Sequence, residues 1–377
     1  MHRTKQPILT AALVCALSLT GCSLEPFLRL AEDYPEEESA QTEESGTETA
    51  AAETRSAEEV SSLADDILSR FRDRFLGDPD GADASQQADS HQEGYVTEPA
   101  ESGGLAVCGY EPEPNPFSDE MLIVPEEIGG QKVTAVGEYG FSGADYAHLV
   151  LLPESVTYFG EYAFKGSSVT EYYHRAEKTV MADYCFMDCP QLSHIIFGEE
   201  PVTLGEYCFD NSGAEDISGT QCSLEADSYC FQDMPKLEHV ALDGDVKLGE
   251  YCFENCPLLS EVILGEGTIT LGNYSFMQSA LNDLVIQENE GGSIGEYCFM
   301  ECWRLEDVIM EEGITEIGDY AFSGCRNLSL VMLPASIEKI GSHAFSDCGL
   351  DIMFDVPADS AAEAFCKEQG FDYTVRN

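Results

Sequence analysis

Apolar residues return at a fixed interval along most of the chain. Ten phenylalanines follow one another at spacings of 22 or 23 residues. In the unit around Phe322, Val331 and Leu333 alternate with an outward residue, as a half-buried β-strand requires. Because one such unit cannot bury its apolar face alone, the pattern predicts stacked units that share a continuous core. The ten phenylalanines are Phe141, Phe164, Phe186, Phe209, Phe231, Phe253, Phe276, Phe299, Phe322 and Phe345.

The residues just before each phenylalanine predict a turn. Gly318 permits a tight turn, and Asp319 is placed to cap a short helical turn that begins at Tyr320. We therefore expect an α/β repeat solenoid with units of 22–23 residues, short strands on one face and short helical turns on the other. Two units depart from the pattern, because their strand segments at 172–174 and 217–219 are short and weakly apolar.

A period of 20 to 29 residues with this strand pattern is the signature of leucine-rich repeats. The unit from Ile317 to Lys339 resembles the BspA-type repeat of bacterial surface proteins, whose pattern is close to I-G-x-x-A-F-x-x-C-x-x-L-x-x-V-x-L-P-x-S-V. The segment from Leu122 to Val133 resembles the usual entry into such an array. The resemblance implies surface display and binding to a protein of a host or neighbouring cell.

The first 22 residues have the pattern of a targeting segment. Arg3 and Lys5 precede the apolar run Ile8–Leu19, which is too short to span a membrane as a stable helix. The sequence Leu-Thr-Gly-Cys that ends at Cys22 resembles the bacterial lipobox, which implies a diacylated Cys22 and an outward-facing place in the cell envelope. The alternative is an ordinary secretory peptide with a cysteine at its cleavage site.

The remaining chain divides by composition. Residues 23–104 hold 22 acidic and 5 basic residues, so we expect a largely disordered tether with a short helix near 57–76. That helix either packs on the solenoid or docks on a partner. The solenoid then occupies 105–356, and a cap at 357–377 contains a helix from Ala358 to Gln369.

Charge and missing motifs restrict the function. With 71 acidic and 18 basic residues, the formal charge of -53 argues against nucleic acid and against membrane contact other than through a lipid anchor. The sequence has no nucleophile elbow, no phosphate-binding loop and no His-Glu-x-x-His motif, so we expect neither an enzyme nor a cofactor.

Cysteines and acidic residues also recur in fixed positions. Since Ala163 and Ala321 replace the cysteine before the phenylalanine, that position suits a small buried side chain more than a zinc ligand. The ladder Cys185, Cys208, Cys230 and Cys252 would permit disulfides in an exported protein, but we expect reduced thiols. Carboxylates at the turn after the strand either bind Ca²⁺ or are solvated. They are Glu154, Glu199, Asp243, Glu266, Glu288 and Glu311.

Two further rows are candidate binding surfaces. A tyrosine precedes the phenylalanine by two positions in nine of ten units, and these rings either cover the core edge or form a recognition strip. Aliphatic residues fill the outward strand position, where polar residues are usual. We predict that this aliphatic row binds a protein partner; the alternative function is a structural or cation-binding envelope component. The row comprises Leu151, Ile196, Ile263, Val285, Ile309 and Met332. The histidines His148, His174, His194 and His239 share no repeat position and are expected to be incidental.

Overall fold

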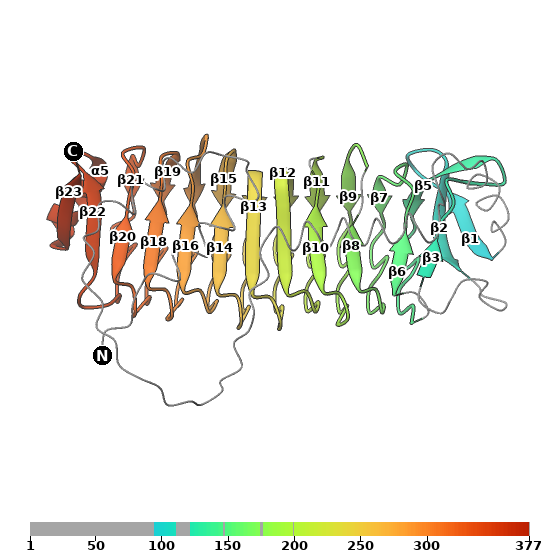
Figure 1. Ribbon diagram of the computed structural model, residues 1–377, viewed down its shortest axis with the longest axis horizontal. Helices are drawn as coiled ribbons and strands as arrows, with labels where there is room; N and C mark the ends of the chain where they lie inside the picture. Colours follow the sequence, from blue (N-terminus) through green and yellow to red (C-terminus); the bar gives the residue numbers. More distant parts are fainter. Residues whose placement is uncertain (1–93, 111–120, 146–147, 174–175, 199, 377) are drawn as a thin grey trace, which may run out of the picture. The chain divides into compact units, whose positions relative to one another are not determined.

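The computed structural model describes residues 94–110, 121–145, 148–173, 176–198 and 200–376. These residues form 23 strands and the single helix α5. Consecutive repeat units, here called rungs, lie side by side in single file (Figure 1). Within this part of the chain, no helix is both long and apolar enough to cross a membrane. The signal segment at 1–22 and the expected helix near 57–76 lie outside the described residues.

Each rung contributes a first and a second strand, and each kind pairs in parallel with its counterpart in the next rung. The first strands form ladder 1, and the second strands form ladder 2. Ladder 1 comprises β8 (Glu171–Tyr173), β10 (His194–Phe197), β12 (Asp216–Ala226), β13 (His239–Leu248), β14 (Glu261–Leu264), β16 (Asp283–Ile286), β18 (Asp307–Met310), β20 (Leu330–Met332), β22 (Met353–Pro357) and β23 (Asp372–Arg376).

Ladder 2 joins ladder 1 through β12 and β13, which are long enough to pair in both. Its other members are β2 (Leu105–Tyr110), β5 (Gln131–Val136), β7 (Tyr158–Phe159), β9 (Thr179–Met181), β11 (Val202–Leu204), β15 (Thr268–Leu271), β17 (Gly291–Ile294), β19 (Ile314–Ile317) and β21 (Lys339–Ile340). The expectation of a short strand at 217–219 is therefore wrong, because β12 continues through this segment into ladder 2.

The core runs the length of the array. The ten repeat phenylalanines are at most 2% exposed, and successive rings lie 4.7–5.4 Å apart between centroids. Inward strand residues such as Val262, Leu284 and Val308 close the core from ladder 1. The predicted stacking of units on one shared core is thus confirmed.

The expected helical turns are not present, and the α/β assignment is corrected to a solenoid made mostly of strands. In the rung of Phe253, the backbone N–H of Tyr251 donates to Asn273 O at 3.1 Å, and that of Phe253 donates to Ser275 O at 2.6 Å. Both acceptors belong to the next rung, so these N–H groups cannot form a helix within their own unit. Tyr251 also has a φ of 57°, outside the right-handed helical region.

Asp319 does not cap a helical turn, contrary to our expectation. Its Oδ1 accepts a hydrogen bond from the backbone N–H of His343, one rung further, at 2.7 Å. Asp183 Oδ1 likewise accepts a bond from the next rung, from the backbone N–H of Glu206 at 2.9 Å. This side chain therefore joins two rungs and does not begin a helix.

The N-terminal end of the array is closed by a hairpin. The strand β1 (Tyr95–Pro99) pairs antiparallel with β2, and Tyr95 packs against Tyr110 with ring centroids 4.9 Å apart. The tether boundary that we expected at residue 104 therefore falls inside this hairpin. Nearby, β4 (Glu127–Ile128) pairs antiparallel with β5, and β3 (Met121–Ile123) forms a separate two-stranded sheet with β6 (Leu149–Leu151).

At the C-terminal end, α5 (Ala361–Gln369) lies between β22 and β23. Ser360 Oγ accepts from the Glu363 N–H, and Gly370 ends the helix in the left-handed conformation with a φ of 79°. Phe365 is 8% exposed and packs near Phe345 and Phe354. The helix thereby covers apolar rings of the last rung.

Candidate binding surfaces

Parallel register brings four of the six predicted binding residues together. Ile263 pairs with Val285, Val285 with Ile309, and Ile309 with Met332, on four adjacent strands of ladder 1. Their strand neighbours are buried, so these four point away from the core. Val285, Ile309 and Met332 are half-buried, whereas Ile263 is only 4% exposed. We call these four residues the aliphatic column.

The other two predicted residues lie apart from this column. Ile196 is separated from Ile263 by Ser218 and Ala241, which occupy the same strand position in β12 and β13. Leu151 belongs to β6, whose register partner is Ile123 in the separate two-stranded sheet. The predicted row is therefore interrupted by two small residues.

A column of ionisable residues runs beside the aliphatic column, and two of the histidines belong to it. Register aligns His194, Asp216 and His239 in adjacent rungs, so our expectation that the histidines share no repeat position is wrong for this pair. His239 Nδ1 lies 2.8 Å from Asp216 Oδ1. His194 Nδ1 lies 3.2 Å from the other carboxylate oxygen, an ion-pair distance without hydrogen-bond geometry.

The contact between His239 and Asp216 shifts the pKa of both groups. The hydrogen bond to Asp216 raises the pKa of His239 against the effect of burial, and the charges of Asp216 and Glu261 raise it further. Burial acts to raise the pKa of Asp216, but the two histidines lower it well below its usual range. Sequence reasoning missed this cluster, because its members are separated by a full repeat.

The tyrosines form one continuous stack, here called the tyrosine ladder. From Tyr139 to Tyr320, successive rings lie 4.7–5.2 Å apart between centroids, with interplanar angles of at most 7°. His343 continues the stack 4.8 Å beyond Tyr320. Tyr139 and His343 at the two ends are exposed, and the tyrosines between them are half-buried. The ladder thus presents ring edges and hydroxyl groups along one side of the return turns.

Most of the described cysteines are buried thiols, and those three positions after a phenylalanine share one environment. All 13 described cysteines are free. A cysteine three positions after the phenylalanine donates from its thiol to the backbone carbonyl of the phenylalanine in the preceding rung. Cys302 Sγ, for example, donates to Phe276 O at 3.2 Å. Ser279 Oγ makes the same bond to Phe253 O at 3.2 Å. In these rungs the residue at this position supplies a hydrogen-bond donor, which its small size alone did not reveal.

The turn carboxylates bond to neighbouring rungs. Asp243 Oδ1 accepts from the Glu266 N–H at 3.0 Å, and Glu311 Oε2 accepts from the Glu288 N–H at 3.0 Å. Glu199 lies outside the described residues. Among the residues that the structure describes, no group of three or more His, Cys, Asp or Glu is arranged to hold a metal ion.

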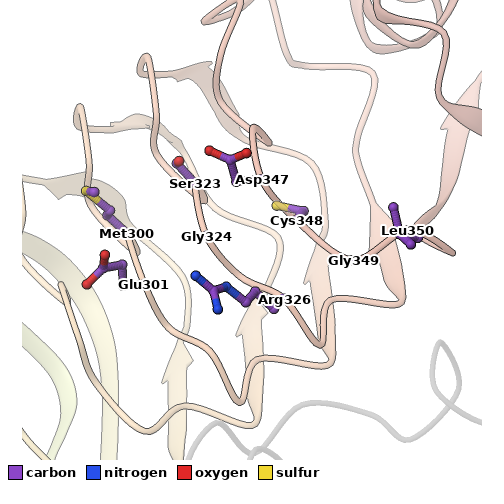
Figure 2. Close-up of a pocket in the computed structure, with 9 residues that line it drawn as sticks. All are labelled: Met300, Glu301, Ser323, Gly324, Arg326, Asp347, Cys348, Gly349 and Leu350. Atoms are coloured by element: carbon purple, nitrogen blue, oxygen red, sulfur yellow. The ribbon is translucent and has the colours of Figure 1, made fainter.

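A shallow pocket of about 500 Å³ lies on three consecutive return segments near the C-terminal end (Figure 2). Gly324 occupies the position that holds Glu301 in the preceding rung and Asp347 in the following one, so its missing side chain leaves a gap in the row. Arg326 also lines the pocket, and the fully exposed Leu350 lies at its edge. The pocket is thus a local interruption of the repeat.

The chain matches a known repeat family, and several solved structures are distantly similar to it. The family model described as the BspA-type leucine-rich repeat region matches residues 126–238 and 224–351, with six copies of the repeat. No curated protein matches the chain. A solved leucine-rich-repeat protein of Bacteroides ovatus is 16% identical, with 76% of this chain and 99% of that chain covered and a TM-score of 0.40.

Two other solved structures are similar to the same degree. The pneumococcal vaccine antigen PcpA is 15% identical, with 75% of this chain and 96% of that chain covered and a TM-score of 0.41. A leucine-rich cell-surface protein of Faecalibacterium prausnitzii is 16% identical, with coverages of 76% and 94% and a TM-score of 0.36.

Proposed function

Because the chain belongs to the BspA-type leucine-rich-repeat family, we propose that it is a surface-displayed lipoprotein whose solenoid binds a protein partner. The partner is a surface protein of a host or neighbouring cell. The proposal assigns the chain a binding role without catalysis and without a cofactor.

The aliphatic column carries this proposal. Water-facing positions of a strand usually hold polar residues, yet Val285, Ile309 and Met332 follow one another there on adjacent strands. Ionisable residues border them, since Asp283 and Asp307 occupy the neighbouring outward position of β16 and β18. An apolar centre with a charged border is the usual composition of a protein-binding surface.

Surface display rests on the N-terminal sequence. The lipobox-like segment that ends at Cys22 supports acylation of this cysteine, and the acidic residues that follow support a role as an extended tether. In this proposal the lipid is the membrane anchor, and the solenoid faces outward.

The proposed binding face is tested with two charge-matched variants of the full chain. Purified host-surface and envelope proteins are immobilised one by one on a biosensor, and the protein that binds saturably is used as the probe. The variant Ile309→Asp/Met332→Asp introduces two carboxylates into the aliphatic column, and we expect at least a hundredfold loss of affinity. The control Ser218→Asp/Ala241→Asp adds the same charge at the same strand position and is expected to bind within threefold of the natural chain.

The two variants separate binding from stability. Both substituted pairs are on outward positions, so each variant is expected to retain its cooperative thermal transition. Equal affinities of the two folded variants would exclude the aliphatic column as the binding face. Ile263 is omitted because a carboxylate at a side chain that is 4% exposed would test folding.

A further inference from the structure

Acidic residues accompany the tyrosine ladder on both sides. The residue directly before the tyrosine is Asp or Glu in seven of nine units. On the other side, Asp210 and Glu254 lie three positions after Tyr207 and Tyr251. Burial raises the pKa of Tyr207 and Tyr251, and neighbouring tyrosines and carboxylates on both sides raise it further. The ladder is therefore an aromatic strip in a negative electrostatic field.

One cationic side chain already lies against this strip. Lys165 Nζ is 5.5 Å from the ring centroid of Tyr162 and 3.7 Å from Asp188 Oδ2 in the next rung. The other oxygen of Asp188 accepts a hydrogen bond from Asn211 Nδ2 at 2.9 Å. The ammonium group thus lies near both a ring and a carboxylate that a neighbouring amide holds in place. This arrangement shows how the edge accommodates a cation.

The corresponding position two rungs later holds a carboxylate without a counter-charge of its own. Asp210 follows Tyr207 by three residues, as Lys165 follows Tyr162. Asp210 is 7% exposed, and its Oδ1 has no hydrogen-bond partner among the described residues. Burial, followed by the charges of Asp233 and Asp188, raises the pKa of Asp210 to about 6, while Lys165 lowers it. A buried, unpaired carboxylate between two others is stabilised when a cation comes near.

From this arrangement we propose that the edge formed by Tyr184, Tyr207 and Tyr229 with Asp188, Asp210 and Asp233 docks an arginine- or lysine-rich segment of another protein. A basic side chain of that segment reaches Asp210 and lies against the tyrosine ladder in the way that Lys165 lies against Tyr162. Arginine fits best, because its planar group both stacks on rings and bonds to carboxylates. This surface is independent of the aliphatic column, so the proposal extends beyond the proposed function.

The first test measures hexa-arginine binding to the full chain by calorimetry at physiological salt. Asp210→Asn keeps the shape of the side chain and removes its charge, and we expect about tenfold weaker binding. The control Glu338→Gln removes one charge from an exposed side chain elsewhere in the array and is expected to change the affinity less than twofold. Equal losses in the two variants would show attraction to the total charge only and would overturn the proposal.

A second pair of variants gives a gain in place of a loss. Lys165→Met introduces the residue that the next rung carries at this position, Met187, and frees Asp188. Lys247→Met also removes one cation and frees one carboxylate, Glu225, at a distance from the tyrosine ladder. We expect Lys165→Met to bind hexa-arginine at least threefold more tightly than Lys247→Met, and an equal effect would contradict the role of the ladder.

The aromatic contribution and the occupant are tested separately. Tyr207→Leu keeps apolar area without the ring and is expected to weaken hexa-arginine binding about threefold to fivefold. Arg70→Gln/Arg72→Gln/Arg74→Gln removes a basic cluster of the chain itself and is expected to leave the affinity unchanged. A tenfold gain in that variant would assign the edge to the chain's own segment and overturn an external partner. If millimolar Ca²⁺ displaces hexa-arginine from the natural chain but not from Asp210→Asn, the site is a cation site, and the proposal of a polypeptide ligand is overturned.

Discussion

At the residue scale, the cysteine that stands three positions after the phenylalanine in five of the ten units has a role beyond filling space. Cys302 is fully buried, and its thiol adds a second hydrogen bond to Phe276 O, which already accepts from the Ser279 N–H. Cys325 and Cys348 make the corresponding bonds to Phe299 O and Phe322 O. Ser279 makes the same bond to Phe253 O, so a thiol and a hydroxyl can serve alike as the donor at this position.

This role predicts a difference between two small substitutions. Cys302→Ala removes the donor and leaves a small gap, so we expect it to lower the free energy of unfolding by about 1–2 kcal/mol. Cys302→Ser retains a donor, as Ser279 does, and is expected to cost less. Denaturant unfolding of both variants measures the difference, and equal stability of the two would remove the hydrogen bond from the explanation.

The contact between His239 and Asp216 predicts a pH dependence of stability. Because its folded-state pKa is raised, the protonated form of His239 stabilises the fold. This contribution is complete below the usual histidine pKa of 6.5 and is lost as the pH rises through the raised value. Asp216 contributes in the opposite direction, because its pKa is lowered in the folded state. Its stabilising contribution is present above its usual pKa of 3.8 and is lost as the pH falls through the lowered value.

His239→Gln is therefore expected to be more destabilising at pH 5.5 than at pH 8.5. Urea unfolding of the natural chain and the variant at both pH values measures this difference. His148→Gln serves as the control, because His148 contacts a backbone carbonyl and not a carboxylate. A destabilisation by His239→Gln that does not change with pH would contradict the role of the ion pair.

At the element scale, the rung is defined by its bonds to other rungs. The sequence was sufficient to predict the phenylalanine core, the row of tyrosines and a C-terminal helix that ends at Gln369, because these follow from spacing and local signals. The helix begins at Ala361, after the cap at Ser360, and not at Ala358 as expected. The sequence was not sufficient for the return turns: Gly-Glu-Tyr-Cys-Phe resembles a helix start, but the N–H groups of Tyr251 and Phe253 bond to the next rung. Partners one repeat away also explain why the alignment of His194, Asp216 and His239 was missed.

Close approach of rungs predicts unequal effects at two adjacent glycines of β17. Gly291 and Gly292 both have positive φ, of 135° and 146°. A Cβ added to Gly292 would lie 1.7 Å from Ile269 O, whereas one added to Gly291 meets no atom closer than 4.0 Å. Gly292→Ala is therefore expected to destabilise the chain by about 2–4 kcal/mol more than Gly291→Ala. Thermal unfolding of both variants tests this. Similar losses of stability in the two variants would contradict the close approach of Gly292 to Ile269 in β15.

At the scale of the whole molecule, two faces of one array differ in chemistry. The aliphatic column lies on ladder 1, and the tyrosine ladder lies on the return turns. The chain's formal charge of -53 favours cationic partners at long range, whereas apolar contact at the aliphatic column is insensitive to salt. The two proposed surfaces are therefore expected to differ in the salt dependence of binding.

In the proposed function, display at the cell surface depends on acylation of Cys22. When the gene is expressed in a bacterium that processes lipoproteins, the natural chain is expected to incorporate labelled fatty acid and to fractionate with membranes. Cys22→Ala removes the acylated thiol, so label and membrane association are both expected to be lost. Membrane association of the unlabelled variant would contradict lipid anchoring.

The central claim, that the aliphatic column contacts a protein partner, is tested most directly by photocrosslinking on intact cells. A photoreactive amino acid replaces Ile309 or Met332 in turn, and Ser218 serves as the control on the same outward strand position. The account predicts one discrete crosslinked protein from positions 309 and 332 that is weak or absent from position 218. The absence of a discrete product from 309 and 332, or equal yields from all three positions, would contradict it.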